Sequence, residues 1–292
     1  MKKNITIGVI LMTMACGCSR GSIEKSVTPQ RIISLAPSIT ETLFALGLGE
    51  KLVGVTNHCN YPSQARSIER VGDYDNANIE RIITLKPDLV FVSREHERQR
   101  AALERLKIPA VVIDNFRYAS VCSSFVLIGR ICGVERAADS LTGLFRSKMV
   151  DNIKSGRRVP KVLVCVGRDS PGSGKIRSIF AAGLQTFLSD LIFAAGGRNV
   201  FVDSLQIYPR ISREGLISLS PDIIIDIAPA MDDYNCDLLV NDWQEMTRVP
   251  AVKNKQVYCM SESYATLPGP RLLLLLNDFE KIFSAWREER SR

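Results

Sequence analysis

Few residues of this 292-residue chain have side chains and spacing suited to chemistry. His58 and His96 are its two histidines, and neither belongs to an HxH or HxxxH pair, which excludes a histidine-rich metal cage. His58 stands beside Cys59 and could contact a soft metal, although a loop histidine without a partner in sequence more often has a structural role. We therefore expect no resident metal and no cofactor.

Motifs of common enzyme classes are missing. The segment DSPGSGK at 169–175 resembles a phosphate loop, but Asp169 and Ile176 occupy the positions where that motif needs Gly and Ser or Thr. GLGEKL at 47–52 lacks the third glycine of a dinucleotide fingerprint, and no GxSxG sequence marks a hydrolase. These absences favour a binding protein over an enzyme.

An acidic residue recurs at the same place in two similar segments. NIERIITLKPDLVFV at 78–92 and SREGLISLSPDIIID at 212–226 align so that Glu80 falls on Glu214. In each segment a good N-cap opens a short helix, a proline follows its end, and strand-like residues come next. The chain therefore builds one helix-to-strand corner twice.

The elements around these corners also repeat. A strand at 31–36 leads to SITE at 38–41, where we expect Ser38 to be the N-cap and Glu41 its capping-box partner. Strands at 51–56 and 110–114, with helices at 96–106 and near 119–131, complete the first half. The second half has a strand at 161–167 and a helix at 184–196. Strands that alternate with helices predict parallel sheets covered on both faces, hence two α/β lobes.

The segment at 135–156 has apolar residues at the 3.6-residue period and no proline. A helix of about 22 residues would be about 33 Å long and could join the lobes as a stiff connection. We therefore predict an N-terminal lobe at 31–134, a linking helix at 135–157 and a C-terminal lobe at 158–292.

The N-terminus has the features of an export signal. Two lysines precede a short apolar run that stops at CGCS, so residues 1–17 are predicted to be a signal peptide and 18–30 a polar linker. The small residues before it make Cys18 the better lipid-anchor candidate, with Cys16 as the alternative. A plain secretory signal with incidental cysteines stays open. No later apolar stretch is long enough to cross a membrane.

The charge and the remaining cysteines constrain the class further. Without residues 1–17 the formal charge falls from +7 to +5, because two lysines and no acids are lost. The arginines are scattered, which argues against nucleic-acid binding. Cys122, Cys132 and Cys165 lie in apolar runs and are predicted to be buried thiols. Among pairings of the other cysteines, Cys236–Cys259 is the favoured disulfide.

The segment at 31–92 closely resembles the opening of the substrate-binding proteins for cobalamin and ferric siderophores that serve ABC importers. The similarity resumes at YPRISREGLISLSPDIII and at LPGPRLLLLLNDF, so it covers 31–285. It implies the class III periplasmic-binding-protein fold, in which two three-layer α/β lobes, each with a central parallel sheet, are joined by a single long helix. The ligand of such proteins lies between the lobes.

The resemblance also assigns a role to the repeated acids. In similar proteins an exposed Glu on each lobe meets arginines of the two-fold-related membrane subunits, and Glu80 and Glu214 match those positions. Two equivalent acids also suit a partner with two equivalent faces. The alternative is that each acid only complements its helix dipole, which is worth about 0.3–1 kcal/mol.

The resemblance places ligand-binding residues on the loops that follow strands. Tyr61, Tyr74 and Tyr208 match positions where cobalamin-binding relatives hold aromatic rings against the corrin, although Tyr74 and Tyr208 replace tryptophans and Ser93 stands where another can occur. Flat rings suit a large planar ligand. The matching loops are 37–38, 57–62, 72–78, 93–96, 167–175, 206–210 and 262–271, and their basic candidates are Arg94, Arg168, Arg210 and Arg271.

The sequence thus predicts a lipid-anchored, extracytoplasmic substrate-binding protein that captures a cobalamin-like corrinoid and delivers it to the transmembrane subunits of an ABC importer. A ferric siderophore or heme is the alternative ligand. An α/β enzyme that uses the same cleft is a remote alternative, because catalytic motifs are missing.

Overall fold

The computed structural model describes residues 28–150, 158–202, 206–228 and 235–291. The predicted signal peptide, the lipid-anchor candidates Cys16 and Cys18, most of the polar linker and the last part of the predicted linking helix lie outside these residues. None of the described helices is long and apolar enough to span a membrane.

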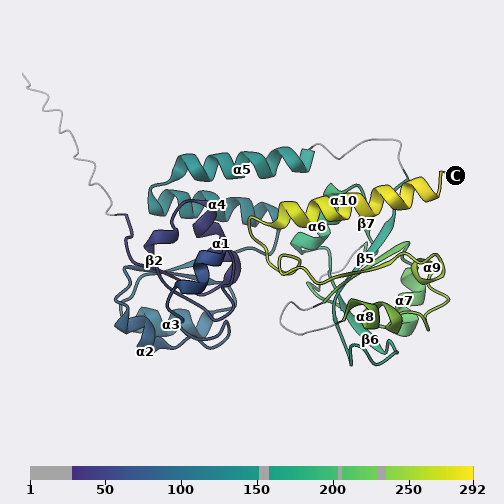
Figure 1. The fold of residues 1–292 in the computed structure, drawn as a ribbon, viewed down its shortest axis with the longest axis horizontal. Coiled ribbons are helices and arrows are strands. Elements are labelled where there is room, and N and C mark those ends of the chain that lie inside the picture. The colour runs from purple at the N-terminus through teal and green to yellow at the C-terminus, as the bar shows by residue number, and fades with distance from the viewer. Residues whose placement is uncertain (1–27, 151–157, 203–205, 229–234, 292) are drawn as a thin grey trace, which may run out of the picture.

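The N-terminal lobe is built on a four-stranded parallel sheet in the order β2-β1-β3-β4 (Figure 1). Apolar side chains pack on both of its faces, as expected for parallel strands covered by helices. The strands are β1 (Ile32–Ser34), β2 (Leu52–Val55), β3 (Leu89–Ser93) and β4 (Ala110–Ile113), and the helices are α1 (Pro37–Ala45), α2 (Ile79–Thr84), α3 (Glu97–Arg105) and α4 (Tyr118–Cys132), with 3-10 turns at Gly49–Lys51 and Ser63–Ser67.

The C-terminal lobe has a six-stranded sheet in the order β10-β9-β5-β6-β8, with β7 also paired to β5. β10, β9, β5 and β7 are parallel, whereas β6 and β8 add an antiparallel edge. The strands are β5 (Lys161–Arg168), β6 (Ser178–Ala181), β7 (Arg198–Asn199), β8 (Arg210–Ser212), β9 (Ile223–Ile227) and β10 (Val257–Met260), and the helices are α6 (Phe187–Ala194), α7 (Arg213–Leu219), α8 (Cys236–Asp242), α9 (Pro250–Lys253) and α10 (Leu272–Glu289). The predicted fold class is confirmed, with this mixed edge as an addition.

The repeated corners are also alike in detail. The side chain of Asn78 accepts a hydrogen bond from the Arg81 amide, and that of Ser212 accepts one from Gly215, so both predicted N-caps are confirmed. Asp88 then accepts from the Arg31 amide at 3.0 Å, and the matching Asp222 accepts from Lys161 at 2.9 Å. Each aspartate therefore fastens its corner to the beginning of the neighbouring strand.

The capping box predicted at Ser38 and Glu41 is wrong. Helix α1 begins at Pro37, its N-cap is Ala36, and no side chain caps it. Proline is well suited to the first helical turn because its missing N–H needs no partner there. The carboxylate of Glu41 instead bonds Arg271 of the other lobe.

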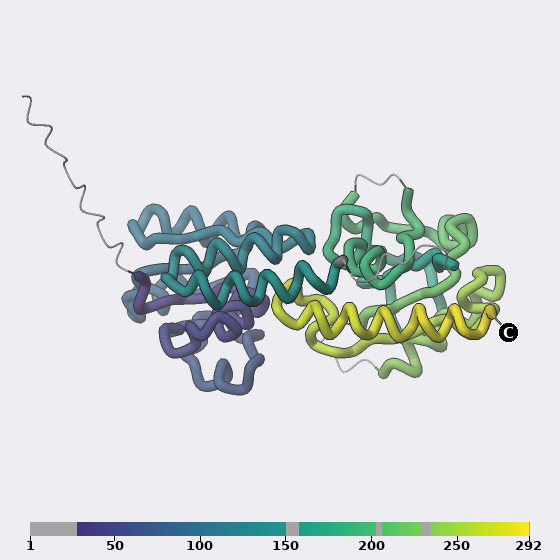
Figure 2. Tube along the Cα trace, turned by 90° about the horizontal axis from the view of Figure 1, so that it is seen from above, coloured from purple at the N-terminus to yellow at the C-terminus, as the bar shows by residue number. Residues whose placement is uncertain are grey.

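The lobes share a packed core on one side of the molecule. Helix α5 (Glu135–Val150) folds back along α4 and points toward the C-terminal lobe, where α6 and α10 lie (Figures 1 and 2). Phe125 of α4 and Phe145 of α5 belong to one apolar cluster with Leu188, Leu191 and other residues of the C-terminal lobe. The lobes are therefore joined by side-chain packing as well as by the chain that connects them.

The cysteines follow the sequence prediction. Cys236 and Cys259 form a disulfide that joins α8 to β10. Cys122, Cys132 and Cys165 are buried thiols, and so is Cys59.

Candidate functional site

A pocket of about 700 Å³ lies between the lobes and is lined by both of them. This volume is within the usual range for small-molecule sites. Six of the seven predicted loops contribute to it; the exception is 167–175. The lining residues are Pro37, Ser38, Glu41, His58, Asn60, Tyr61, Arg66, Asp73, Tyr74, Asp75, Ser93, Arg94, Glu95, Ile113, Asn115, Phe116, Val166, Phe187, Tyr208, Ser263, Thr266, Leu267, Pro268 and Arg271.

The three predicted tyrosines all reach this pocket. Tyr61 and Tyr208 expose 49% and 41% of their surface, so their rings are open to a ligand. Tyr74 is more enclosed, because its hydroxyl is 3.0 Å from Ser93 Oγ and donates to Glu95 at 3.3 Å. Burial, and then the nearby Glu95 carboxylate, raise the pKa of both Tyr74 and Tyr208, so both phenols are neutral near pH 7.

Contacts with the backbone hold the segments that carry Tyr61 and Tyr208 in place. The loop that carries Tyr61 is held by Arg70, whose Nη1 donates to the carbonyls of Thr56 and Cys59 at 2.8 and 3.0 Å. The segment that carries Tyr208, just before β8, passes so close to Gly183 that a Cβ there would lie 2.3 Å from the Gln206 carbonyl oxygen. Both tyrosines therefore stand on well-supported segments.

Arg94 and Arg271 line the pocket, as predicted. The Arg94 guanidinium lies 5.8 Å from the ring centroid of Phe116, a pocket residue that sequence reasoning missed. Arg271 donates from Nε and Nη2 to the two carboxylate oxygens of Glu41 at 2.8 and 2.5 Å. Burial raises the pKa of Glu41, although this bidentate bond opposes the shift.

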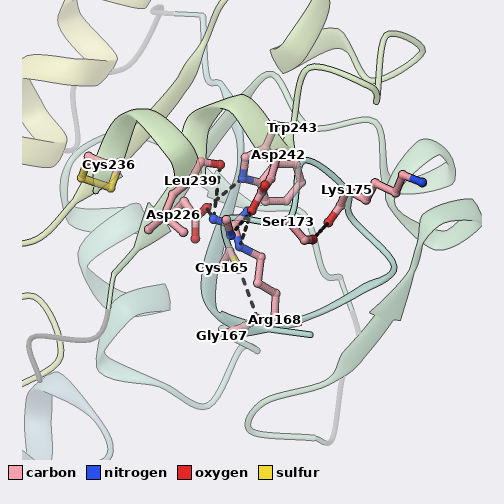
Figure 3. A network of polar contacts seen from close by, with 12 residues as sticks. Cys165, Gly167, Arg168, Ser173, Lys175, Asp226, Cys236, Leu239, Asp242 and Trp243 are labelled. Carbon is pink, nitrogen blue, oxygen red and sulfur yellow. Dashed lines mark hydrogen bonds and ion pairs between the residues drawn. A yellow bond between two sulfur atoms is a disulfide. The ribbon is translucent and has the colours of Figure 1, made fainter. Parts of the chain in front are cut away.

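Arg168 and Arg210 do not line the pocket, so their predicted position is wrong. Arg168 is 2% exposed and points into the C-terminal lobe, where Nη2 is 2.5 Å from Asp226 and Nε is 3.7 Å from Asp242 (Figure 3). Its charge is needed there to balance these buried acids. Arg210 is exposed and pairs with Asp169 at 2.6 Å.

The predicted loop 167–175 is held away from the pocket by the same network. Asp242 accepts hydrogen bonds from the amides of Gly172 and Gly174 at 2.7 and 2.5 Å, which anchors the loop on α8. The partners are about seventy residues apart in sequence, and no local pattern reveals such a contact.

The acids of the pocket were also missed by sequence reasoning. Its lining includes the acids Glu41, Asp73, Asp75 and Glu95 and the bases Arg66, Arg94 and Arg271. Once Glu41 and Arg271 are counted as a neutral pair, three acids face two arginines. The pocket therefore offers no positive surplus for a strongly anionic ligand.

The two histidines differ in position. His58 lines the pocket, with Nε2 3.9 Å from Asp73. His96 is buried, and its Nδ1 is 3.2 Å from both the amide nitrogen and the hydroxyl of Ser93. No group of three or more His, Cys, Asp or Glu within the described ranges could hold a metal ion.

Glu80 and Glu214 lie in the first turns of α2 and α7, one on each lobe. Both are exposed, and neither forms an ion pair within the described part of the chain. In Figure 1 both helices lie on the side of the molecule away from α5 and α10. Hydrogen bonds from its own amide and from Ser212 lower the pKa of Glu214, which keeps it ionised.

Comparison with known proteins agrees with this architecture. Residues 32–264 match the family model described as periplasmic binding protein. The chain is 30% identical to an uncharacterized ABC transporter substrate-binding lipoprotein of Bacillus subtilis, over 84% of this chain and 77% of that protein. It is also 30% identical to a vitamin B12-binding protein of Pectobacterium atrosepticum, over 84% and 85%. The solved periplasmic vitamin B12-binding protein of Vibrio cholerae is 26% identical, with a TM-score of 0.72, over 88% of this chain and 98% of that one.

Proposed function

Because the chain belongs to the periplasmic binding protein family, whose members bind substrates for ABC importers and are not enzymes, we propose that its own ligand is a cobalamin-like corrinoid. The protein captures the corrinoid between its lobes and delivers it to the transmembrane subunits of the importer. The similarity to vitamin B12-binding proteins supports this ligand class.

The observation that carries the proposal is the arrangement of three tyrosines around one pocket. Tyr61 and Tyr74 come from the N-terminal lobe and Tyr208 from the C-terminal lobe. Aromatic rings bury a large area at low cost in side-chain entropy, so rings on both lobes can enclose a large flat macrocycle.

The charge of the pocket supports a corrinoid over a strongly anionic ferric siderophore. Cyanocobalamin has no net charge, whereas ferric siderophores are often anionic. Arg94 can meet the phosphodiester of a cobalamin, and Asp73, Asp75 and Glu95 can accept hydrogen bonds from its amides. A polyanion would face these carboxylates without enough arginines to offset them.

Heme or another iron chelate is the second candidate, favoured by one feature of the pocket. His58 lines it together with the tyrosine phenols, and imidazole and phenolate are both axial ligands of heme iron. His58 and the tyrosine side chains could therefore coordinate the iron of such a ligand.

Delivery requires an anchor and a docking face. We assign the anchor to Cys18, or to Cys16, in a lipoprotein signal that holds the protein outside the cytoplasm. Glu80 and Glu214 are the docking residues, because they offer one exposed carboxylate on each lobe to a two-fold symmetric partner.

A thermal-shift series with cyanocobalamin, hemin and a ferric trihydroxamate tests the ligand class. A ligand that binds only the folded protein stabilises it by about 2.7 kcal/mol at a hundred times its Kd, so the correct ligand raises the melting temperature in a concentration-dependent way. We expect this shift with cyanocobalamin. A shift with hemin or the ferric chelate and none with cyanocobalamin would contradict the proposal.

A further inference from the structure

The Glu41–Arg271 ion pair joins the two lobes in the lining of the pocket. The two residues are 230 positions apart in sequence, and their bond is bidentate. The Glu41 side chain is 3% exposed and that of Arg271 12% exposed, so solvent screens the pair little. The contact is thus a strong polar link between the lobes.

The same guanidinium supports a wall of the pocket. It lies 4.1 Å from the ring centroid of Tyr61, a cation–π contact with the opposite lobe. Its Nη1 donates to Ser263 Oγ at 2.9 Å, while Nε and Nη2 are engaged by Glu41. Every nitrogen of Arg271 therefore has a protein partner, which suits a supporting role better than direct binding of a ligand anion.

The backbone approaches closely at the same place. A Cβ added at Gly269 would lie 3.3 Å from the carbonyl oxygen of Ser38 and 3.6 Å from its Cβ. Ser38 is in the first turn of α1, so the segment just before α10 rests on the beginning of α1. These contacts form a second joint between the lobes, separate from the shared core.

The two joints differ in what holds them. Arg117 and Asp190 also form an interlobe pair, but Tyr118 beside them belongs to the large apolar cluster that spans α4, α5 and α6. Burial of that cluster holds its joint whether or not the ion pair is present. The joint at Arg271 lines an open pocket and depends on the ion pair and its stacking.

We propose that Arg271 is a positioning residue of the pocket: fixed by Glu41, it holds the ring of Tyr61 in place and fastens the lobes at the joint that opens when ligand is released. The shared core at α4, α5 and α6 is the hinge that stays closed. This inference rests on the proposed function, in which the pocket holds the ligand.

Interlobe distances measured without ligand test this role of Arg271. Nitroxide labels at Arg98→Cys in α3 and Lys253→Cys in α9, in the full chain with Cys16→Ser and Cys18→Ser, report the separation of the lobes. We expect Glu41→Gln and Arg271→Gln to broaden the distance distribution, and the matched control Arg117→Gln to leave it unchanged. Equal distributions in all three variants would overturn the proposal.

Release of cyanocobalamin gives a second measure. Loss of the support for Tyr61 should speed its dissociation on the order of tenfold in Glu41→Gln and Arg271→Gln but not in Arg117→Gln, because affinity changes reside mainly in the dissociation rate. If the unchanged protein does not bind cyanocobalamin, the corrinoid proposal fails, while the ligand-free distances still decide the role of Arg271.

A cross-link tests the joint without removing the ion pair. The spacing of 3.6 Å between Cβ positions falls in the range for disulfides, so Ser38→Cys combined with Gly269→Cys should oxidise to a bond detected by peptide mass spectrometry. Neither single substitution should give that peptide. Failure of the double variant to cross-link would show that the joint is not closed in solution and would overturn the proposal.

Discussion

Arg168 and Arg210 show how far single residues can be assigned from sequence. Arg168 ends β5 and Arg210 begins β8, next to loops that the resemblance assigns to the ligand. Arg168 is nevertheless buried in an ion network, and Arg210 is exposed on the surface. Tyr61, Tyr74 and Tyr208 were placed correctly because loops after parallel strands converge. The partners of Arg168, Asp226 and Asp242, come from distant elements, and no local pattern predicts them.

The difference between these arginines leads to a stability prediction. Arg168→Met should reduce the free energy of unfolding by about 3–5 kcal/mol, because Asp226 and Asp242 lose their buried counter-charge. Arg210→Met should have little effect, since its pair with Asp169 is exposed. Urea denaturation of both variants measures the contrast, and equal losses would refute the buried role of Arg168.

The free thiols should be unreactive in the native protein. Burial raises the pKa of Cys59, Cys122 and Cys165, and it raises that of Cys132 to about 11, so thiolate is scarce at pH 8. In a chain with Cys16→Ser and Cys18→Ser, iodoacetamide should label none of the four before urea is added and all four afterwards. Rapid labelling of any one in the native state would contradict its burial.

At the scale of elements, the repeated corner was the most predictable feature. Its N-caps, short helices and following strands are local in sequence, and the structure has them in both lobes. The predicted cap at Ser38 failed because Pro37 already begins α1 and Glu41 is drawn to the other lobe. The antiparallel edge of β6 and β8 was missed, since it interrupts an otherwise regular alternation.

The cap of α7 gives a prediction at this scale. Ser212→Ala removes the acceptor of the Gly215 amide and should cost about 1 kcal/mol of stability. Ser218→Ala, the same substitution at an exposed site within α7, should be neutral or slightly stabilising because alanine favours helix. Chemical denaturation compares the two, and a neutral Ser212→Ala would argue against the cap.

At the scale of the whole molecule, the sequence predicted two lobes, a cleft and a stiff helical connection, but not the side-chain contacts that join the lobes. The shared core of α4, α5 and α6 and the Glu41–Arg271 pair combine residues from opposite ends of the chain. Such contacts depend on the final packing of the lobes rather than on local pattern. They join the lobes at two separate places, the shared core and the edge of the pocket.

Charge reversal tests how the molecule meets its importer. Glu80→Lys combined with Glu214→Lys should abolish stimulation of the importer ATPase and leave cyanocobalamin affinity unchanged, because both acids lie outside the pocket. The matched control is Glu135→Lys with Glu288→Lys, which makes the same charge change at exposed sites on α5 and α10. Full stimulation by the first variant, or equal loss in both, would contradict docking through Glu80 and Glu214.

The most direct test of capture between the lobes is a calorimetric titration with cyanocobalamin of the unchanged protein and of Tyr61→Ala with Tyr208→Ala, one ring removed from each lobe. The unchanged protein should bind one molecule per chain, and the double variant should bind at least tenfold more weakly, since each lost ring removes a large contact area. Equal affinity in the two proteins, or no heat of binding in either, would contradict capture of the corrinoid between the lobes.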